Sequence, residues 1–352
     1  MVINLTAAGD DDGRRLDRVL RKAMRDLPLS AIHRLFRKGY VRIDGKRAAA
    51  NDRIETGQTI IVHLDHDQSI MAEFKKNGFP NDLKDMQYRG LKTINFPPLQ
   101  ILFEGAGLLF LNKPPGLVVH GMAGKYNISL EDQVRSYLAS VIPSSLSFRP
   151  GPLHRLDKPS SGIIVFSTNL QGARLFSELL RKHAVKKSYL ALVEGEIKKS
   201  EFWTDELLRD RDQRKTLVLQ DGEYRSKSAI TKVTPLASNS VFTLVHAEIE
   251  TGRTHQIRAQ AASHGHPLCM DKKYGGHDFP DATSLSKEKT EQFSRNFLLH
   301  AWYMELPSCL GELPCMIKAP LPEYFKNKAI ELFSLKEDFF SRLYRNDREG
   351  QS

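Results

Sequence analysis

The stretch HRLDKPSSGIIVFS, residues 154–167, joins a polar turn to an apolar strand. Asp157 stands in this turn among hydroxyl side chains, close to a histidine and an arginine. An aspartate in such a turn more often caps a helix or braces the turn than performs chemistry. Asp157 therefore becomes a catalytic candidate only if other unusual clusters accompany it elsewhere in the chain.

Two further clusters accompany this turn. GRTHQIR, residues 252–258, holds more polar side chains than a buried segment tolerates without partners. On a strand, Arg253 and His255 would share one face, while Arg258 would lie on the other. An exposed sheet edge would explain this polarity equally well. KKSYLALVEG, residues 186–195, places Tyr189 at the start of an apolar strand, where a core tyrosine is the simpler interpretation.

The net charge of the 352-residue chain is +10, and nearly all of it lies near the N-terminus. Between Arg14 and Arg47, twelve basic and three acidic residues leave a local charge of +9. Positive charge concentrated in this way attracts polyanions and makes their binding salt-dependent. A merely soluble surface is the alternative, but we interpret the segment as an RNA-binding module. The residues that we expect to contact RNA there are Arg18, Arg21, Arg34, Arg37, Lys38 and Arg42.

The N-terminal segment also has a regular pattern of secondary structure. Apolar residues at helical spacing predict a helix within residues 14–34. Ser30 is expected to cap a second short helix. Residues 40–43 and 60–64 then read as strands, and Asp44-Gly45 as a tight hairpin turn. The expected unit is helix–helix–strand–turn–strand, a small α/β domain.

The remainder of the chain is expected to form a larger α+β domain, because strand-like runs outnumber the helices and do not alternate with them regularly. The expected domains are residues 1–64, a linker at 65–99, a catalytic domain at 100–320 and a helical tail at 321–352. The predicted strands are 108–111, 117–119, 163–167, 189–193 and 242–249, with a helix at 169–184 and an amphipathic helix at 323–345.

Cysteine usage and hydropathy exclude several classes of protein. Cys269, Cys309 and Cys315 have the spacing of neither a disulfide framework nor a zinc site, so we expect no metal. No apolar run approaches the roughly 20 residues of a membrane helix. The first residues lack the pattern of a secretory signal. We therefore expect a cytoplasmic protein with no membrane partner.

Taken together, HRLDKPSSG, KKSYLALVEG and GRTHQIR resemble, in this order, the motifs of the RluA family of pseudouridine synthases. LNKPPGLVVHG at 111–121 and FLLHA at 297–301 are similar to that family's first and closing strands. The stretch from RLDRVL to VRIDGKR, residues 15–47, resembles the S4 RNA-binding domain. VHGMAG at 119–124 and HPLCMDKKYGG at 266–276 make the chain most similar to RluC-type enzymes, which act on bacterial 23S ribosomal RNA.

The resemblance implies a pseudouridine synthase fold, an α+β structure with a largely antiparallel mixed sheet flanked by helices and loops. It implies that Asp157 attacks the target nucleoside, that Tyr189 packs against the uracil, and that Arg258 pairs with the aspartate. Arg155 would help to hold the flipped nucleotide or fill its place. Further contacts to RNA are expected from His154, Arg253, His255 and Gln256. Neither cofactor nor metal is implied, and a monomer acting on ribosomal RNA is expected.

Three alternatives stay open at this point. The chain could be a non-catalytic RNA-binding or ribosome-assembly factor of the same fold, although Asp157, Tyr189 and Arg258 are all present. It could modify tRNA, although simpler tRNA-acting relatives often lack an S4-like domain. A hydrolytic enzyme would usually need a second carboxylate, and neither HRLDKPSSG nor GRTHQIR contains one. Gln260 departs from the family pattern, because a histidine is common at that position.

Overall fold

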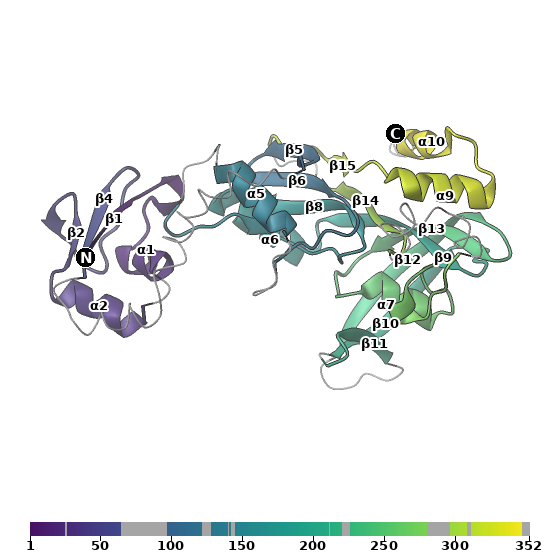
Figure 1. Ribbon diagram of the computed structural model, residues 1–352, viewed down its shortest axis with the longest axis horizontal. Coiled ribbons are helices and arrows are strands. Elements are labelled where there is room, and N and C mark those ends of the chain that lie inside the picture. The colour runs from purple at the N-terminus through teal and green to yellow at the C-terminus, as the bar shows by residue number, and fades with distance from the viewer. Residues whose placement is uncertain are drawn as a thin grey trace. The chain divides into compact units, whose positions relative to one another are not determined.

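The computed structural model describes residues 1–24, 27–64, 97–121, 128–139, 141, 145–210, 212–219, 226–279, 296–307 and 311–346. Nearly all of the predicted linker, part of the VHGMAG stretch, Cys309 and the last six residues lie outside these ranges. The chain divides into two compact units (Figure 1). The first comprises residues 1–99, 131–151 and 167–174, and the second comprises residues 100–130, 152–166 and 175–352.

The first unit contains a four-stranded sheet covered by two helices, drawn in purple in Figure 1. Its helices are α1 (Leu16–Ala23) and α2 (Leu29–Arg37), and its strands are β1 (Val2–Thr6), β2 (Val41–Ile43), β3 (Lys46–Arg47) and β4 (Thr59–His63), in the order β1-β4-β2-β3. The helical stripe is buried as predicted, including Leu16, Val19 and Leu20. Asp44 and Gly45 both have positive φ angles, 48° and 81°, as a tight hairpin turn requires. The predicted order of elements is therefore confirmed.

Two details of this unit differ from the prediction. Ser30 does not cap α2, because the helix already begins at Leu29 with Pro28 as the residue before it. The ring of Pro28 holds its φ at −63°, which suits the start of a helix without any side-chain hydrogen bond. Strands β1 and β3 were not predicted; β1 pairs along its whole length with β4, and β3 pairs with β2.

A buried carboxylate ties a distant segment to this unit. Asp11 is fully buried at the end of the 3-10 helix η1 (Gly9–Asp11). Its oxygens accept hydrogen bonds from the backbone amides of Leu146 and Ser147, each at 2.9 Å. The Ser145 hydroxyl donates a third hydrogen bond at 2.9 Å. Residues 145–147 therefore pack with the N-terminal elements although they lie more than 130 positions further along the chain.

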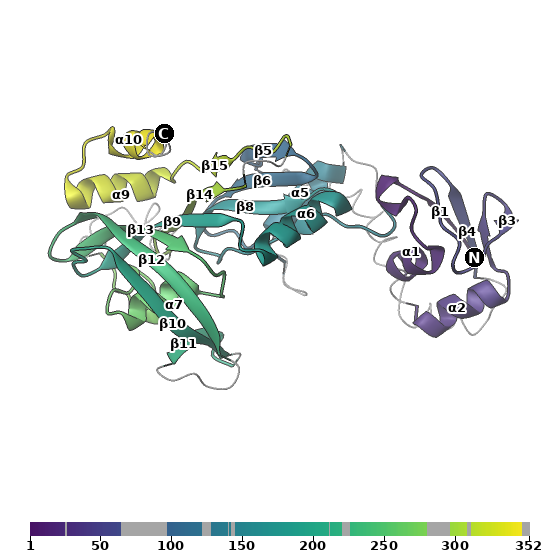
Figure 2. The same cartoon turned by 180° about the vertical axis from the view of Figure 1, so that it is seen from behind.

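The second unit is built on an eleven-stranded mixed sheet, seen from both sides in Figures 1 and 2. The order of its main path is β11-β10-β12-β13-β9-β14-β8-β6-β5, with β15 beside β14 and β7 beside β8. Strand β8 runs parallel to β14, whereas β9 is antiparallel to both of its neighbours. The bounds are β5 (Ile101–Gly105), β6 (Leu108–Lys113), β7 (Gly151–Pro152), β8 (Ser161–Ser167), β9 (Lys186–Glu194), β10 (Glu201–Asp210), β11 (Lys215–Leu219), β12 (Lys227–Ser238), β13 (Phe242–Ile249), β14 (Leu299–Glu305) and β15 (Met316–Lys318).

Helices cover both faces of the sheet around β9. Successive side chains of a strand point to opposite faces. Tyr189 and Ala191 accordingly belong to one core with Ile257 of α7, whereas Leu190 and Leu192 belong to another with Phe325 of α9. This alternation makes β9 the strand on which both cores are built. Nearly all of α5 (Leu130–Ala139) and the first turn of α6 (Leu170–Arg181) belong to the first unit, whereas α7 (Gln256–Ser263), α9 (Glu323–Phe333) and α10 (Phe339–Asn346) belong to the second.

Most of the predicted elements of this unit are confirmed, and two are wrong. Residues 117–119 form no strand, because Pro114, Pro115 and Gly116 turn the chain after β6 and the Leu117 carbonyl bonds to a lysine side chain. The tail at 323–345 is two helices instead of one. Ser334, in the left-handed conformation with φ 50°, ends α9. Within the described parts of the chain, no helix has the length and apolar character needed to cross a membrane.

Candidate active site

The turn that carries Asp157 is held by a buried lysine. Lys113, at the end of β6, donates hydrogen bonds to the carbonyl oxygens of Pro114, Leu117 and Lys158 at 2.9, 2.9 and 3.1 Å. Burial lowers the pKa of Lys113 to about 7, against the opposing influence of the nearby Asp157 carboxylate. Because the Lys158 carbonyl follows Asp157 directly, this lysine fixes the backbone from which the aspartate projects.

The end of the turn is fastened to the closing strand. The Ser161 hydroxyl lies 2.9 Å from Nδ1 of His300 on β14, and the opposite ring nitrogen lies 3.2 Å from the Ala319 carbonyl. That carbonyl can only accept, so His300 carries its proton on Nε2 and accepts from Ser161. Gly162 has φ 103°, and a Cβ there would lie 2.2 Å from the Ala301 carbonyl oxygen. Only glycine allows β8 to approach β14 so closely.

Arg258, on α7, lies between two carboxylates. One terminal nitrogen, Nη1, donates to Oδ2 of Asp157 at 2.7 Å. The other two nitrogens, Nε and Nη2, donate to the two oxygens of Asp271 at 2.6 and 2.8 Å. Burial opposes the charge of Arg258, but the hydrogen bonds and negative charges of Asp271 and Asp157 outweigh it, so the pKa of Arg258 is raised. The guanidinium therefore remains charged beside Asp157.

The segment GRTHQIR forms no strand, so neither of the strand faces considered for it applies. Its first half is a turn, and α7 begins at Gln256 after His255 has adopted the left-handed conformation with φ 54°. Gln256 is buried and braces the turn, because it accepts from the Arg253 amide at 3.1 Å and donates to the Ile230 carbonyl at 3.1 Å. Because this part of the segment is helical, the side chain of Arg258 points inward to Asp157. The alternation of side chains along a strand does not predict this direction.

His255 approaches the second oxygen of Asp157. Its Nε2 lies 3.6 Å from Oδ1, and its Nδ1 lies 2.9 Å from the Tyr274 hydroxyl. We assign the proton to Nε2, which faces the carboxylate, so that the Tyr274 hydroxyl donates to Nδ1. That hydroxyl also accepts from the Thr216 amide at 2.8 Å. Burial lowers the pKa of His255 to about 4, so its ring is neutral near pH 7.

Tyr189 lies in the centre of the sheet. On β9 it is paired with Ala247 of β13 on one side and with Ala301 of β14 on the other. These small neighbours leave room for the ring, and Tyr189 as a whole is 8% exposed. Burial, and then the negative charge of Asp157, raise the pKa of Tyr189 well above that of a free tyrosine. Its hydroxyl is therefore a neutral phenol close to the carboxylate.

The other residues predicted for the site have different surroundings. Arg155, two positions before Asp157 in the chain, is exposed, and Arg253 is exposed with its Nε donating to the Ser228 carbonyl at 3.1 Å. His154 accepts a hydrogen bond from the Val165 amide at 3.1 Å and stacks on Phe176. Burial lowers the pKa of His154 to about 3, which makes it a neutral packing residue of the turn.

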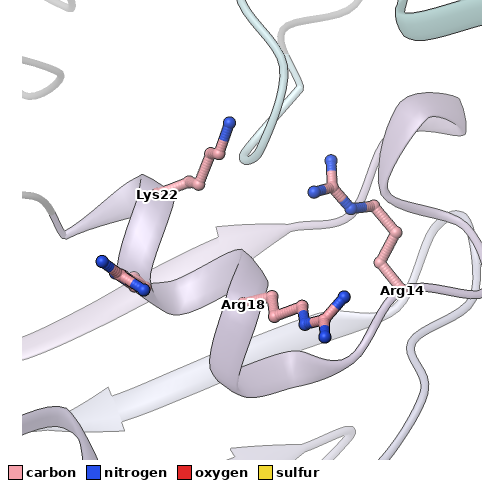
Figure 3. A pocket seen from close by; sticks show the side chains of 4 residues that line it. Arg14, Arg18 and Lys22 are labelled. Atoms are coloured by element: carbon pink, nitrogen blue, oxygen red, sulfur yellow. The ribbon is translucent and has the colours of Figure 1, made fainter. Parts of the chain in front are cut away.

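The predicted basic residues of the N-terminal unit lie on its surface. Arg18, Arg21, Arg37, Lys38 and Arg42 are exposed, and Arg34 is half-buried. Arg18, Arg21 and Lys22 on α1, together with Arg14 just before it, line a cleft of about 580 Å³ (Figure 3). Arg14 also donates to the Ser147 hydroxyl at 2.7 Å, which fixes one wall of this cleft.

Three supporting residues were missed by sequence reasoning. They are Lys113, Asp271 and Tyr274, and each lies in a stretch, 111–121 or 266–276, that had been noted only for its family resemblance. Asp271 is a second acid near Asp157, but its side chain is only 2% exposed and lies behind Arg258. It is therefore not placed to deliver water, as a hydrolytic enzyme would require. None of the described residues forms a group of three or more histidine, cysteine or acidic side chains that could hold a metal.

Comparison with known proteins identifies the family. A family model described as RNA pseudouridylate synthase matches residues 107–263. Ribosomal large subunit pseudouridine synthase C of Haemophilus influenzae is 30% identical over 304 residues, which cover 85% of each chain. Ribosomal large subunit pseudouridine synthase D of Nitrosomonas europaea is 30% identical over 327 residues, 91% of this chain and 85% of that protein. The structure of human RNA Pseudouridylate Synthase Domain Containing 4 shares the fold, with a TM-score of 0.54 and 21% identity over 73% of this chain and 99% of that one. The chain therefore belongs to the RNA pseudouridylate synthase family, whose members isomerise uridine to pseudouridine in RNA.

Proposed function

We propose that this enzyme modifies uridine in large-subunit ribosomal RNA and that Asp157 is its catalytic carboxylate. One observation supports this role above the others. Oδ2 of Asp157 is held by Arg258, whereas Oδ1 makes no hydrogen bond to any described residue, and the side chain is 22% exposed. One oxygen is thus fixed and the other is available to a bound nucleoside.

The reaction places few demands on the protein besides this oxygen. The N1–C1′ bond breaks and a C5–C1′ bond forms, after which C5 loses its proton and N1 gains one. No electron acceptor or donor group is consumed. Asp157 can either attack C1′ or remove the 2′ proton, and both routes use an ionised carboxylate. The charged guanidinium of Arg258 holds one oxygen of this carboxylate by a hydrogen bond.

The target nucleotide has to leave its stack to reach Asp157. Extrusion costs a few kcal/mol, which stacking and hydrogen bonds in the pocket offset. Tyr189 offers an aromatic surface whose hydroxyl stays protonated. Arg155, which is exposed and lies two positions before Asp157 in the chain, offers a planar cation that can hold the flipped nucleotide or occupy the space it vacates. Water has to be excluded, because hydrolysis would leave an abasic site, and a single accessible carboxylate suits that requirement.

We also propose that residues 1–64 form an S4-like RNA-binding domain. The order of its elements, the exposed arginines and the basic cleft of Figure 3 support this assignment. Basic side chains that contact phosphates raise affinity without reading sequence. The names of the relatives from Haemophilus influenzae and Nitrosomonas europaea support large-subunit ribosomal RNA as the target.

The catalytic assignment is tested with Asp157→Asn. The variant should release no tritium from RNA labelled at C5 of uridine, while its RNA affinity remains within about twofold of wild type, because only one charge in the pocket changes. Asp338→Asn, at an exposed aspartate paired with Arg342, is the matched control and should be fully active. Tritium release by Asp157→Asn at the wild-type rate would disprove the assignment. Mapping pseudouridine across total RNA with and without the gene identifies the target.

The RNA-binding role of the N-terminal unit is tested with Arg18→Ala/Arg21→Ala. Each phosphate contact contributes about 0.7–0.9 to the slope of log affinity against log salt, so the double variant should lower that slope by about 1.5. The control is Lys182→Ala/Lys198→Ala, at two exposed lysines of the second unit, which should leave the slope unchanged. An equal slope in wild type and in the arginine variant would argue against RNA binding by α1.

A further inference from the structure

We propose that Asp271 is a positioning residue that keeps one oxygen of Asp157 free for the substrate. The inference rests on the proposed catalytic role of Asp157. Asp271 acts through Arg258, because it accepts hydrogen bonds from Nε and Nη2 of that residue at 2.6 and 2.8 Å. The two residues are 13 positions apart, and their contact is buried.

The argument begins with the shape of the guanidinium. Its five N–H groups lie in one plane, and a lone carboxylate usually binds two of them side by side, through both of its oxygens. In this structure Asp271 occupies that two-pronged position. Asp157 consequently accepts a single hydrogen bond from Arg258, from Nη1 to Oδ2 at 2.7 Å. Without Asp271, Arg258 would be free to turn and engage both oxygens of Asp157, including the one that the nucleoside needs.

Two aromatic rings pack against the same guanidinium and limit its movement. Its central carbon lies 4.3 Å from the ring centre of Phe297 and 4.9 Å from that of Tyr274. Such contacts favour a cation over a ring face. Asp271 thus sets how the guanidinium of Arg258 is turned within its plane, and the two rings constrain the tilt of that plane. As a result, Nη1 points at Asp157.

The backbone around Asp271 is firmly attached to the central strand. Cys269 donates a backbone hydrogen bond to Leu192 of β9 at 3.0 Å, and Asp271 donates one to Leu268 at 3.0 Å. Gly276 closes the turn by donating to the Asp271 carbonyl at 2.9 Å. A Cβ at Gly276 would lie 2.0 Å from the Leu268 carbonyl oxygen, so no other residue fits. Asp271 is therefore fixed to the same strand that carries Tyr189.

Burial separates Asp271 from the chemistry itself. Its side chain is 2% exposed, and the only side-chain hydrogen bonds it makes to described residues are those from Arg258. It can neither contact RNA nor exchange protons with it. Its effect on the reaction must therefore pass through the direction and charge of Arg258.

The first test compares Asp271→Asn with wild type. Asparagine has nearly the same shape but only one acceptor oxygen and no charge, so Arg258 should turn toward Asp157. We expect kcat to fall by up to about 100-fold, the loss that a misplacement of about 1 Å in a reacting group can cause. KM for the RNA should change by less than about threefold. Asp271→Glu keeps the charge and both acceptors, so its kcat should lie closer to wild type than that of Asp271→Asn.

The second test is a double-mutant cycle with Arg258→Gln. If Asp271 acts only through Arg258, Asp271→Asn should cause no further loss of kcat in the Arg258→Gln background. Thermal unfolding, followed by tryptophan fluorescence, checks that each variant is folded. A wild-type kcat in Asp271→Asn, equal losses in the Asn and Glu variants, or the same loss in both backgrounds would overturn the inference.

The outcomes also separate this inference from the proposed function. Full activity in Asp157→Asn would overturn the catalytic assignment itself. An inactive Asp157→Asn together with a fully active Asp271→Asn would leave that assignment intact and remove only the role of Asp271.

Discussion

The buried His300 should make the free energy of unfolding depend on pH. It is fully buried on β14, where it accepts from the Ser161 hydroxyl and donates to the Ala319 carbonyl. Both contacts use the neutral ring, and burial lowers the pKa of His300 from 6.5 to about 4. The unfolded chain therefore binds a proton at pH values where the folded chain does not, and acid should destabilise the fold.

The magnitude follows from the two pKa values. Between pH 4 and pH 6.5 the unfolded state binds more protons, so the free energy of unfolding falls as the pH falls. Integrated from pH 7.5 to pH 5, the loss due to His300 alone is about 2 kcal/mol. Above pH 7 the residue should contribute almost no pH dependence.

The measurement is urea unfolding of wild type and His300→Gln at pH 7.5 and pH 5. Both tryptophans, Trp203 and Trp302, belong to the second unit, so their fluorescence reports on the unit that contains His300. Glutamine preserves a donor and an acceptor but does not titrate. Between pH 7.5 and pH 5, the free energy of unfolding of wild type should fall by about 2 kcal/mol more than that of His300→Gln. His154 and His255 are present in both proteins, so their contributions cancel. Identical losses would refute the reasoning.

Three further substitutions test the supports of the site. Gly162→Ala should destabilise the second unit by about 3 kcal/mol, because its Cβ would meet the Ala301 carbonyl; thermal unfolding measures this. Arg258→Lys should reduce kcat by about 100-fold while the protein stays folded, because an ammonium group cannot reproduce the fork between two carboxylates. Gln260→Leu should lower the free energy of unfolding by about 2–4 kcal/mol but retain catalysis, since the groups bonded to Gln260, among them the Trp203 carbonyl and the Asp205 carboxylate, belong to β10 and β12 and not to the Asp157 turn.

Periodic patterns predicted the sheet strands well. The predicted strand 242–249 coincides with β13, and 163–167 and 189–193 lie within β8 and β9. The apolar runs of β8 and β9 are nearly continuous because both faces of these strands are buried. The prediction failed at α7 for the same physical reason. Every residue from Gln256 to Ala261 is buried, so this helix shows no apolar stripe, and its polar side chains had suggested an exposed edge.

Of the residues that build the candidate site, those within the three family motifs were predicted, and those outside the motifs were not. The pairing of Arg258 with Asp157, 101 positions apart, followed from family resemblance and is present in the structure. Lys113 and Asp271 were not predicted, because their partners are backbone carbonyls and a guanidinium that only the folded chain brings to them. Gln260, in contrast, was noted as a departure from the family pattern, and its contacts show a role in packing.

The central position of β9 has a consequence for how the enzyme and its RNA adapt to each other. Four strands of the sheet's main path lie on each side of β9, so its amide protons should be among the last in the protein to exchange with solvent. Tyr189 and the turn that holds Asp271 are both attached to this strand. A scaffold that opens so rarely has little freedom to reshape itself around a substrate. In the proposed mechanism, the distortion needed to bring a uridine to Asp157 therefore falls mainly on the RNA.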